Sequence, residues 1–394
     1  MKSLIRKLVA GIVFLTIFFS VMGGAHYYIL KRIALDPSWP PGVAAGAVAM
    51  MTLGLVALIV QGILRRRVGV LASALSWVAY VWLGVLFYLF ISTAMLDLAT
   101  SVFVFATERG PELATSRPFL RGRALMICGI TLLASLAALR IGLQPPVTKR
   151  IEIALDRFPE ALDGFRIVQI SDVHIGPLLG ERFSALVTER VNALEPDLIA
   201  VTGDLVDGRV KSIAKQVEPF RGLRAEHGIY FVTGNNDYYS GADDWVSLVT
   251  SYGWHTLRNR SVSIGTSGAK FELVGVDDPH GDMLESGGGE DLNLALRDVD
   301  TTRAVVLLAH DPATFRRARK IPVGLQLSGH THGGQIWPFG WAVRAVVPWV
   351  AGHFREGASQ LYVSSGTGFW GPPMRLGTRA EITELTLRCV RTSV

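Results

Sequence analysis

The chain contains almost no cysteine: Cys128 and Cys389 are the only two among its 394 residues. Cys128 lies inside an apolar run and Cys389 lies near the C-terminus. Neither a disulfide framework nor a cysteine-ligated metal site can be built from such a pair. Two cysteines leave the redox compartment of the protein open.

Acidic residues and histidines are scarce in residues 1–150. This part holds 15 Lys or Arg, 4 Asp or Glu and one histidine, whereas residues 151–394 hold 24, 29 and 8. The net charge is therefore +11 in the first part and −5 in the second, which gives +6 for the chain. Because the positive excess accompanies apolar segments, a basic surface for nucleic acid is a poor interpretation. We expect no nucleic-acid partner.

Long apolar runs characterise the first part. Four of them lie at residues 8–30, 43–63, 68–98 and 124–143. Crossing a hydrocarbon core of about 30 Å takes about 20 helical residues. We therefore predict an all-α transmembrane region of about four spans over residues 1–145, a linker at 146–155 and a soluble domain at 156–394. Asp97, in the third run, is expected at a helix end near the interface rather than at a site inside the membrane.

Positive charges beside these runs bear on orientation. Lys2, the cluster Arg65–Arg67 and the pair Lys149–Arg150 favour a cytoplasmic location for their segments. The arginine-rich loop 108–123 argues the other way, and the soluble domain would lie outside if residues 68–106 crossed the membrane twice. We predict an integral protein of a bacterial-type inner or plasma membrane, with a cytoplasmic soluble domain and the lipid bilayer as partner.

From residue 151 onwards, short apolar runs alternate with amphipathic segments, which is typical of an α/β domain. The strand candidates are "FRIVQIS", "DLIAVTG", "GIYFVTG", "FELVGV", "AVVLLAH", "GLQLSGH", "QLYVSS" and "EITELTL". The helix candidates are residues 183–194, 210–223, 243–252 and 312–320. The length of this part, about 245 residues, suffices for one two-sheet domain. We predict the α/β class.

Five strand candidates end in side chains that can bind a metal ion. These side chains are Asp172, His174, Asp204, Asn235, His310, His330 and His332. Ligands of an open α/β sheet gather outside the carboxyl ends of its strands, and residues i and i+2 of an extended chain project to the same side. One such motif alone is usually a surface turn or a core histidine, whereas five in one domain indicate a joint site. The nearby Asp207 is interpreted as a loop or helix-cap residue.

The ligand types indicate which metals bind. Carboxylate, imidazole and amide ligands without thiolate suit Mn, Fe, Zn or Co rather than a structural zinc. Seven side chains exceed what one ion needs, so we predict two divalent metal ions that share the carboxylate of Asp204. Two ions about 3.5–4 Å apart clamp a phosphoryl group and lower the pKa of a bridging water, so that hydroxide forms near neutral pH.

The order of these motifs resembles one family. Asp-x-His, Gly-Asp-x-x-Asp, Gly-Asn-x-Asp, a lone His and Gly-His-x-His, over about residues 160–390, resemble the calcineurin-like metallophosphoesterases. The strings "GNNDYYSG", "GHTHGGQ" and "GTGFWGPPMRLG" are similar to its membrane-associated branch, which contains transmembrane phosphoesterases. The resemblance implies two mixed sheets packed face to face and flanked by helices. It implies one ion held by Asp172, His174, Asp204 and His332, and another held by Asp204, Asn235, His310 and His330.

One position departs from the family pattern. The residue after Asn235 is usually His, which is thought to neutralise the transition state or to protonate the leaving group, but it is Asn236 in this chain. An amide can donate a hydrogen bond to a phosphoryl oxygen but cannot act as a general acid, and losing such proton transfer costs a factor of about 10²–10⁴. Either another group takes this role or the leaving group needs no proton. The candidate replacements, each also explained as a structural residue, are His227, His255, His280 and His353.

Further predictions concern neighbours of the ligands. Asp237 is expected to orient its loop or to support a ligand. Tyr238 either lines a substrate groove or packs the loop, and His280 and Gln335 are placed beside ligands or substrate. The apolar, aromatic segment 339–350 is too short to span a membrane. It forms either a packed loop over the site or a lip that touches lipid.

The predicted function is a dinuclear metal-dependent hydrolase of phosphomonoesters or phosphodiesters, which uses a metal-bridging hydroxide and has a lipid-linked substrate as one option. Asn236 leaves open a second function, a metal-binding sensor or scaffold with weakened catalysis. A transporter regulated by the hydrolase is a third possibility, but charged residues are too scarce in the spans for a conduction path. No feature of the sequence indicates an oligomeric state.

Overall fold

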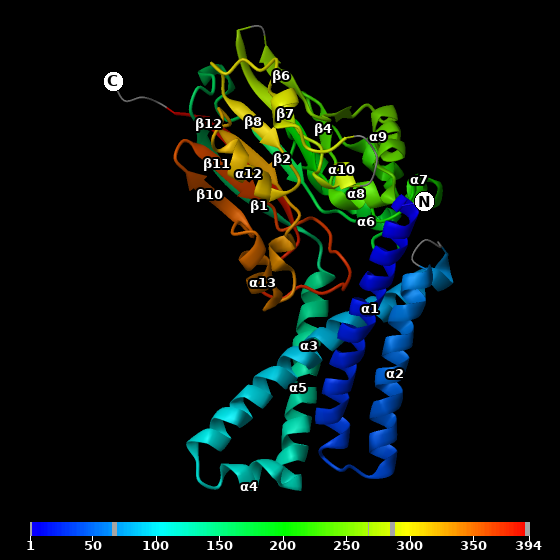
Figure 1. The fold of residues 1–394 in the computed structure, drawn as a ribbon. Coiled ribbons are helices and arrows are strands. Elements are labelled where there is room, and N and C mark those ends of the chain that lie inside the picture. The colour runs from blue at the N-terminus through cyan, green and yellow to red at the C-terminus, as the bar shows by residue number, and fades with distance from the viewer. Residues whose placement is uncertain (1, 65–68, 267, 284–287, 391–394) are drawn as a thin grey trace. The chain divides into compact units, whose positions relative to one another are not determined.

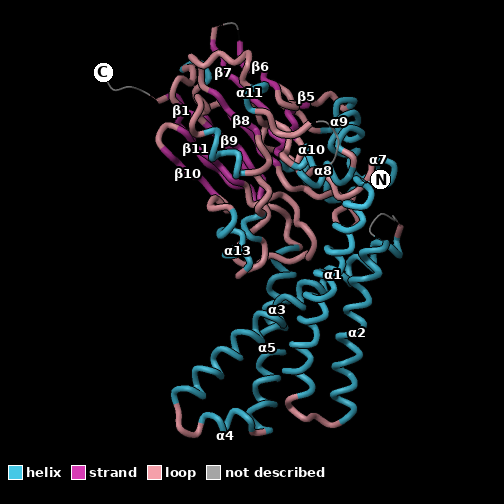
Figure 2. Tube along the Cα trace, viewed as in Figure 1, coloured by secondary structure: helices cyan, strands magenta, loops and turns pink. Residues whose placement is uncertain are grey.

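The structure is a computed structural model that describes residues 2–64, 69–266, 268–283 and 288–390. It consists of two compact units. The helical unit comprises residues 1–65 and 70–139, and the α/β unit comprises residues 66–69 and 140–394. The strands drawn in Figure 2 all belong to the α/β unit.

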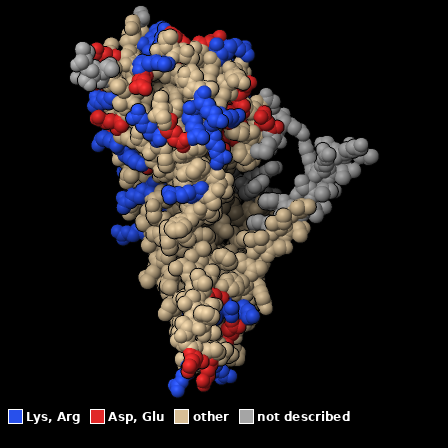
Figure 3. Space-filling view, turned by 60° about the vertical axis from the view of Figure 1, so that its left-hand side comes forward, with Lys and Arg blue, Asp and Glu red and all other residues tan. Residues whose placement is uncertain are grey.

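Long helices form the helical unit (Figure 1). They are α1 (Lys2–Leu30, followed by a π-helical turn, Lys31–Leu35), α2 (Pro41–Leu64), α3 (Val70–Ala106), the short α4 (Gly110–Thr115) and α5 (Arg117–Gly142). Among the described residues, three segments are long and apolar enough to cross a membrane: Pro41–Ile63, Val70–Ala106 and Arg117–Gly142. On the face drawn in Figure 3, the helical unit carries few charged side chains except at one end. The predicted span 8–30 lies within α1, and several of its side chains fall outside the described residues.

Helix α3 is a single helix of 37 residues. At 1.5 Å per residue it is about 55 Å long, which exceeds a hydrocarbon core of about 30 Å. The alternative in which residues 68–106 cross the membrane twice is wrong, because α3 runs from Val70 to Ala106 without a turn.

Asp97 is also not at a helix end, because α3 continues to Ala106. Its carboxylate accepts hydrogen bonds from the Tyr28 hydroxyl and Arg32 Nε at 2.8 Å each, and from Arg123 Nη1 at 2.9 Å. Arg32 Nη1 also pairs with Asp36 at 2.9 Å. Acidic and basic side chains therefore compensate each other among these helices, which avoids the cost of an isolated buried charge.

Replacement of Asp97 by asparagine is expected to destabilise the helical unit by about 3–5 kcal/mol, because a buried guanidinium loses its closest anion. The affected group is Arg123, whose side chain is 7% exposed. Thermal unfolding of the full chain in detergent measures the effect. Asp36→Asn is the control with a smaller expected shift, since Asp36 lies 3.9 Å from Arg123. Unchanged unfolding of Asp97→Asn would contradict a stabilising role for the pair.

Two six-stranded mixed sheets form the α/β unit. The first has the order β1 (Val147–Leu155), β12 (Glu381–Cys389), β2 (Arg166–Ile170), β3 (Leu198–Thr202), β4 (Ile229–Val232) and β5 (His255–Thr256). The second has the order β10 (Gly352–Glu356), β11 (Ser359–Val363), β9 (Leu325–Ser328), β8 (Val305–Leu308), β7 (Ala269–Gly275) and β6 (Arg260–Thr266). The predicted fold class, α/β with two mixed sheets flanked by helices, is confirmed.

The main core lies between the two sheets, where Ile167 and Leu198 of the first share one apolar cluster with Phe271 and Leu308 of the second. Residues of α6 (Glu181–Asn192), α7 (Val210–Val217) and α9 (Ala242–Ser251) pack on the first sheet. Residues of α11 (Leu292–Ala295) and α12 (Phe315–Ala318) pack on the second. The other short helices are α8 (Asn235–Ser240), α10 (His280–Met283) and α13 (Phe339–Val346). Central strands are thus buried on both faces, which explains their continuous apolar runs.

The segment 146–155, predicted as a linker, differs from that prediction. Val147–Leu155 form β1, which pairs in parallel with β12 along its whole length. Ile153 and Leu155 are buried in the core between the sheets, while most of the preceding residues of β1 are exposed or half-buried. The charged and half-exposed start of this edge strand hides its period-2 pattern.

Candidate metal centre

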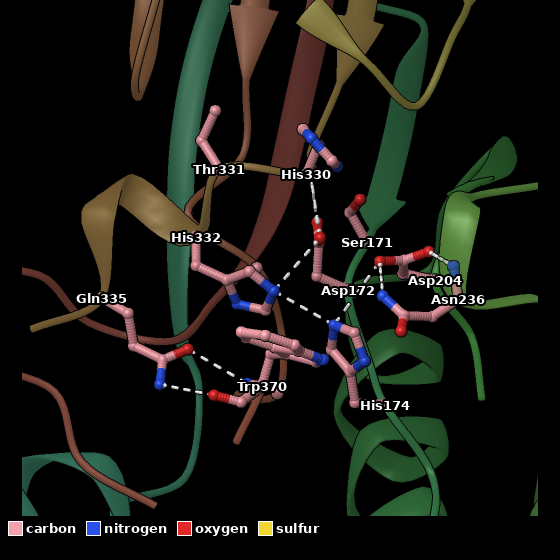
Figure 4. Close-up of polar contacts among 12 residues, drawn as sticks. Ser171, Asp172, His174, Asp204, Asn236, His330, Thr331, His332, Gln335 and Trp370 are labelled. Carbon is pink, nitrogen blue, oxygen red and sulfur yellow. Dashed lines mark hydrogen bonds and ion pairs between the residues drawn. The ribbon is translucent and has the colours of Figure 1, made fainter. Parts of the chain in front are cut away.

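The carboxyl ends of five strands from both sheets meet at one edge of the α/β unit. Two contacts join the sheets at this edge. Nδ1 of His310, after β8, lies 2.8 Å from the carbonyl oxygen of Thr202 in β3, and the amide of His330, after β9, donates to Asp172 Oδ1 at 2.9 Å. Side chains from distant segments therefore point toward one another there (Figure 4).

Asp172, His174 and His332 form the first ligand cluster, in which one ligand atom of each lies within 4.8 Å of the others. His174 Nε2 is 3.0 Å from His332 Nε2, which in turn is 3.4 Å from Asp172 Oδ1. All three side chains are buried. Facing imidazole nitrogens this close need a proton or a cation between them, because two lone pairs repel each other.

Asp204, His310 and His330 form the second cluster, with ligand atoms again within 4.8 Å of one another. His310 Nε2 lies 3.3 Å from Asp204 Oδ2 and 3.2 Å from His330 Nδ1. Asp204 Oδ2 is also 3.8 Å from Nε2 of His174 in the first cluster. Asp204 therefore lies between the two clusters, where a shared carboxylate is expected.

One buried polar atom at this edge fits a metal centre. The side-chain oxygen Oδ1 of Asn235 has no hydrogen-bond partner among the described residues. Buried polar atoms are nearly always paired, and an exception calls for an ion, a water or a functional role. An oxygen and imidazole nitrogens are the donors that Mn, Fe, Zn and Co accept. The residues present thus fit the two predicted divalent ions.

Five of the predicted ligands occupy left-handed backbone, which non-glycine residues rarely adopt. Their φ angles are 52° for Asp172, 52° for His174, 53° for Asp204, 70° for His330 and 50° for His332. Each such residue costs about 1–2 kcal/mol, and strain of this kind clusters at functional sites. The tight turns after the strands direct the side chains into one site instead of continuing the chain away from it.

Two glycines allow the loops to approach each other. A Cβ atom on Gly234 would lie 2.2 Å from Asp204 Oδ1, and one on Gly329 would lie 2.1 Å from Asp172 Oδ2. A side chain at either position would displace a carboxylate of the site. This close approach explains the glycines that precede Asn235 and His330 in the motifs.

The charges at the site are strongly coupled. Burial alone would lower the pKa of His174, but the carboxylates of Asp207, Asp204 and Asp172 raise it to about 9. Burial and the neighbouring His174 hold the pKa of His332 well below its usual value. Of the two facing imidazoles, His174 therefore binds a proton more strongly than His332. A metal ion that binds His174 competes with this proton.

Asp237 joins the two loops that carry Asp204 and Asn235. Its Oδ2 accepts the backbone N–H groups of Asp204 and Gly234, each at 2.9 Å, and its Oδ1 accepts that of Leu205 at 2.9 Å. The side chain is buried. The structure thus places Asp237 where it orients its loop.

Asp207 and Arg375 contact the predicted ligands in ways the sequence did not reveal. Asp207 Oδ1 lies 2.9 Å from His174 Nδ1 and so fixes the orientation of this imidazole. This contact gives Asp207 a more specific role than the predicted loop or helix-cap residue. Its place as the second Asp of the Gly-Asp-x-x-Asp motif was the sequence signal that could have indicated this role. Arg375 is fully buried, and its Nη1 donates to the His332 carbonyl at 3.3 Å. In the sequence, the only signal for Arg375 was that it belongs to the string "GTGFWGPPMRLG".

Asn236 contacts the proposed shared carboxylate. Its backbone N–H donates to Asp204 Oδ1 and its side-chain amide donates to Asp204 Oδ2, both at 2.7 Å. The amide thus lies at the site, directed at Asp204 (Figure 4).

Tyr238 and Gln335 support the loops around the site through hydrogen bonds to backbone carbonyl oxygens. Tyr238 is 7% exposed, and its hydroxyl donates to the Gly288 carbonyl at 2.7 Å, so it packs the loop and does not line a groove. The Gln335 amide donates to the carbonyl oxygens of Trp370 at 2.9 Å and Pro372 at 3.0 Å. Gln335 therefore holds the 370–372 loop beside the His332 turn (Figure 4).

Only one of the four candidate replacement histidines lies near Asn236. His227 packs on Phe165, and His255 stacks on Tyr230 at the start of β4, the opposite end from Asn235. His353 lies on the outer strand β10 and contacts Gln360.

His280 differs because its ring packs edge-to-face on the ring of Tyr239 in α8, with the two ring centroids 6.2 Å apart. Helix α8 begins with Asn235 and Asn236. Its Nδ1 lies 2.7 Å from Oδ1 of the buried Asp278. The Asp278 charge also helps to raise the pKa of His310 above its usual value, after the larger effects of burial, which lowers it, and of Asp204 and Asp172, which raise it. The backbone N–H of Asp278 donates to Thr233 Oγ1 at 3.4 Å, so the Asp278–His280 pair lies beside the loop that carries Asn235.

Segment 339–350 begins with helix α13, in which none of the residues is buried. Val347, Trp349 and Val350 after the helix are buried. The segment thus has an exposed helix followed by a buried end. The alternative of a packed loop therefore fits only its last residues.

Comparisons with known proteins give one family. The model of the calcineurin-like phosphoesterases matches residues 165–334. A Danio rerio protein named "Transmembrane protein with metallophosphoesterase domain" is 33% identical over 326 residues, which is 80% of this chain and 74% of that protein. A Bos taurus protein of the same name is 38% identical over 270 residues, 66% of this chain and 61% of its own length. The chain therefore spans about three fifths of the bovine relative.

A bacterial relative and a solved structure each match more than half of the chain. The "Uncharacterized metallophosphoesterase YkuE" of Bacillus subtilis is 33% identical over 240 residues, 58% of this chain and 81% of that protein. A dimetal phosphatase from Danio rerio has 12% identity and a TM-score of 0.36, covering 57% of this chain and 98% of its own.

Proposed function

Because the chain belongs to the calcineurin-like phosphoesterase family, we propose that its α/β unit hydrolyses phosphoesters with two divalent metal ions bound at the edge where the strand ends of the two sheets meet. The observation that carries this proposal is the pair of ligand clusters with Asp204 between them. The buried, unpartnered Asn235 oxygen, counted among the described residues, adds a further donor.

The clusters divide the ligands as the family pattern does. Asp172, His174 and His332 would hold one ion, and Asn235, His310 and His330 would hold the other, with Asp204 shared. Two bound divalent ions supply Lewis acidity at phosphoryl oxygens and lower the pKa of water to near neutrality. The protein's own residues fix these donors: Asp207 orients His174, and Asp237 ties the two turns that carry Asp204 and Asn235.

We assign the proton donor for the leaving group to His280. Nδ1 of its imidazole faces Asp278, so its Nε2 is the nitrogen that can hold or deliver a proton. The side chain is 30% exposed and contacts α8, so it can reach a substrate above Asn236. A carboxylate behind the imidazole stabilises the required tautomer, as in other acid–base pairs.

Replacement of His280 by glutamine is expected to lower kcat/KM for an alkyl phosphoester by about 10²–10⁴-fold, because the alkoxide leaving group needs a proton. A nitrophenyl ester, whose leaving group needs none, should lose less than about tenfold. His353→Gln is the matched control, since His353 lies on β10. Equal losses on both esters would remove His280 from this role.

Asn236 also discriminates between the hydrolase and a weakened sensor. Asn236→His is expected to lower turnover for two reasons. The hydrogen bond from the Asn236 side-chain amide to Asp204 Oδ2, 2.7 Å long, is lost, and His280 already serves as proton donor. Metal content and turnover of the variant are the measurements. A gain of about 10²-fold or more would favour the sensor or scaffold, because it would show that the natural site lacks an acid.

The substrate class follows from the attachment of the site to membrane helices. The part of the chain that the structure describes has three candidate membrane-spanning helices, and the bovine and Danio rerio relatives are named transmembrane proteins. A lipid-linked phosphoester is the substrate we propose, with the α/β unit on the cytoplasmic side, as the charges of Arg65–Arg67 and Lys149–Arg150 favour. A panel of phosphomonoesters and phosphodiesters, with and without acyl chains, tests this. Indifference to the acyl chain would exclude the lipid-linked class, and no turnover on the whole panel with any of the four metals would exclude the hydrolase.

A further inference from the structure

Large apolar side chains are exposed together on one part of the α/β unit. The members of this aromatic patch, with their exposed fractions, are Trp337 (48%), Phe339 (52%), Trp341 (77%), Val346 (74%) and Trp370 (57%). The other tryptophans of the unit, Trp245, Trp254 and Trp349, are buried. Exposed aromatic side chains at one place, rather than scattered singly, mark an interaction surface.

The fold presents this patch on an ordered support. The backbone N–H of Trp337 donates to the Leu376 carbonyl at 2.9 Å, so that the start of α13 is tied to the 370–377 loop. The Trp370 N–H donates to Gln335 Oε1 at 3.0 Å, and the Gln335 amide returns a bond to the Trp370 carbonyl. The two segments of the patch are therefore held together, and Gln335 follows His332 by three residues.

The patch adjoins the point where the chain leaves a candidate membrane helix. The last turn of α5 belongs to the α/β unit. A Cβ atom on Gly142 in this turn would lie 2.5 Å from the Pro373 carbonyl oxygen and 2.8 Å from Met374 Cα. The end of α5 thus packs directly on the loop that carries Trp370. Gly142 is also the last residue of the candidate span Arg117–Gly142, so this loop lies beside the residue at which that span ends.

The side chains have the chemistry of a membrane interface. Tryptophan is enriched at the headgroup level, where its ring is buried and its N–H stays hydrated. Arg344 lies on α13, and Arg316 Nη2 donates to the Val346 carbonyl at 3.3 Å, so positive charge adjoins the apolar side chains. Such charge suits anionic headgroups. Helix α13 has 8 residues, about 12 Å, and so can lie in the interface but cannot span.

We propose that the aromatic patch enters the headgroup region of the same bilayer that the chain's own helices span. Its apolar side chains are then removed from water, which favours the membrane-bound position of the patch. The contact holds the His332–Gln335 turn at the membrane surface. A protein partner would cover the patch equally well, but the adjoining end of α5 favours lipid.

Depth-dependent quenching in proteoliposomes tests the proposal. The full chain with Cys128→Ser and Cys389→Ser receives a single new cysteine, Trp341→Cys, which carries a fluorophore. The control position is Leu294→Cys on α11, an exposed apolar residue outside the patch (41% exposed). Val346→Cys provides a second patch position should Trp341→Cys fold poorly. The vesicles contain phosphatidylglycerol and a lipid with a nitroxide near the headgroup.

Quenching at position 341 or 346 is expected to exceed that at 294 several-fold, because interfacial helices lie about 5–10 Å deep in the headgroup region. Equally weak lipid quenching at patch and control positions would overturn the proposal. So would a patch label that is protected from aqueous iodide without being quenched by the lipid nitroxide, since protein would then cover the surface. The measurement does not depend on turnover, so its failure would leave the proposed hydrolysis unaffected.

Discussion

Replacing Asp204 by asparagine is expected to lower kcat/KM for phosphoester hydrolysis by about 10³-fold or more. Asp204 Oδ2 lies 3.3 Å from His310 Nε2 and 3.8 Å from His174 Nε2, so it serves both ligand clusters. An asparagine offers one neutral oxygen and cannot be shared as an anion by two cations. Metal ions contribute several kcal/mol of transition-state stabilisation, and about 4 kcal/mol corresponds to 10³-fold.

Steady-state kinetics with saturating Mn²⁺ measure this loss, and circular dichroism checks that the variant is folded. Asp298→Asn is a suitable control, because Asp298 is an exposed aspartate of the same unit. An Asp204→Asn enzyme within about tenfold of the natural chain would show that the carboxylate is not shared by two ions.

Asp237→Asn is expected to destabilise the α/β unit by about 2–6 kcal/mol, although it changes no predicted ligand. The carboxylate accepts backbone N–H groups on both oxygens, from Asp204 and Gly234 on one and Leu205 on the other. An asparagine NH₂ group would face N–H donors and leave two of them unpaired, at about 1–3 kcal/mol each. The turns that carry Asp204 and Asn235 would separate, so we expect activity to fall with stability.

Chemical denaturation, followed by tryptophan fluorescence, gives the change in the free energy of unfolding. Asp244→Asn is the matched control, since Asp244 is exposed on the neighbouring helix α9. Unchanged stability combined with lost activity would show that Asp237 acts on the chemistry and not through the two turns.

The sequence-based strand predictions succeed for buried strands and fail at the sheet edges. All eight predicted strands are present, and the four that were missed, β1, β5, β6 and β10, are the outermost strands of the two sheets. A central strand is covered on both faces and forms a continuous apolar run, whereas an edge strand is covered on one side and mixes polar with apolar residues. β5 has only 2 residues, too few for any periodicity.

The candidate ligands could be named from the sequence because each follows a strand directly. Strand ends on neighbouring strands converge by geometry, so local motifs carry long-range information. The supporting contacts have no such local signature. Arg375 reaches the His332 carbonyl across 43 residues, and Asp278 and His280 take their place through the packing of α10 on α8. These contacts depend on tertiary packing, which a single sequence does not show.

The metal content of the purified full-length chain is the most direct test of the central claim, that two ligand clusters bind two divalent ions. The chain is stripped with chelator, exchanged into excess Mn²⁺, freed of unbound ions and analysed by mass spectrometry of the metal against protein concentration. We expect two ions per chain for the natural sequence and one at most for Asp204→Asn. One ion or none in the natural chain, with the α/β unit folded, would contradict it.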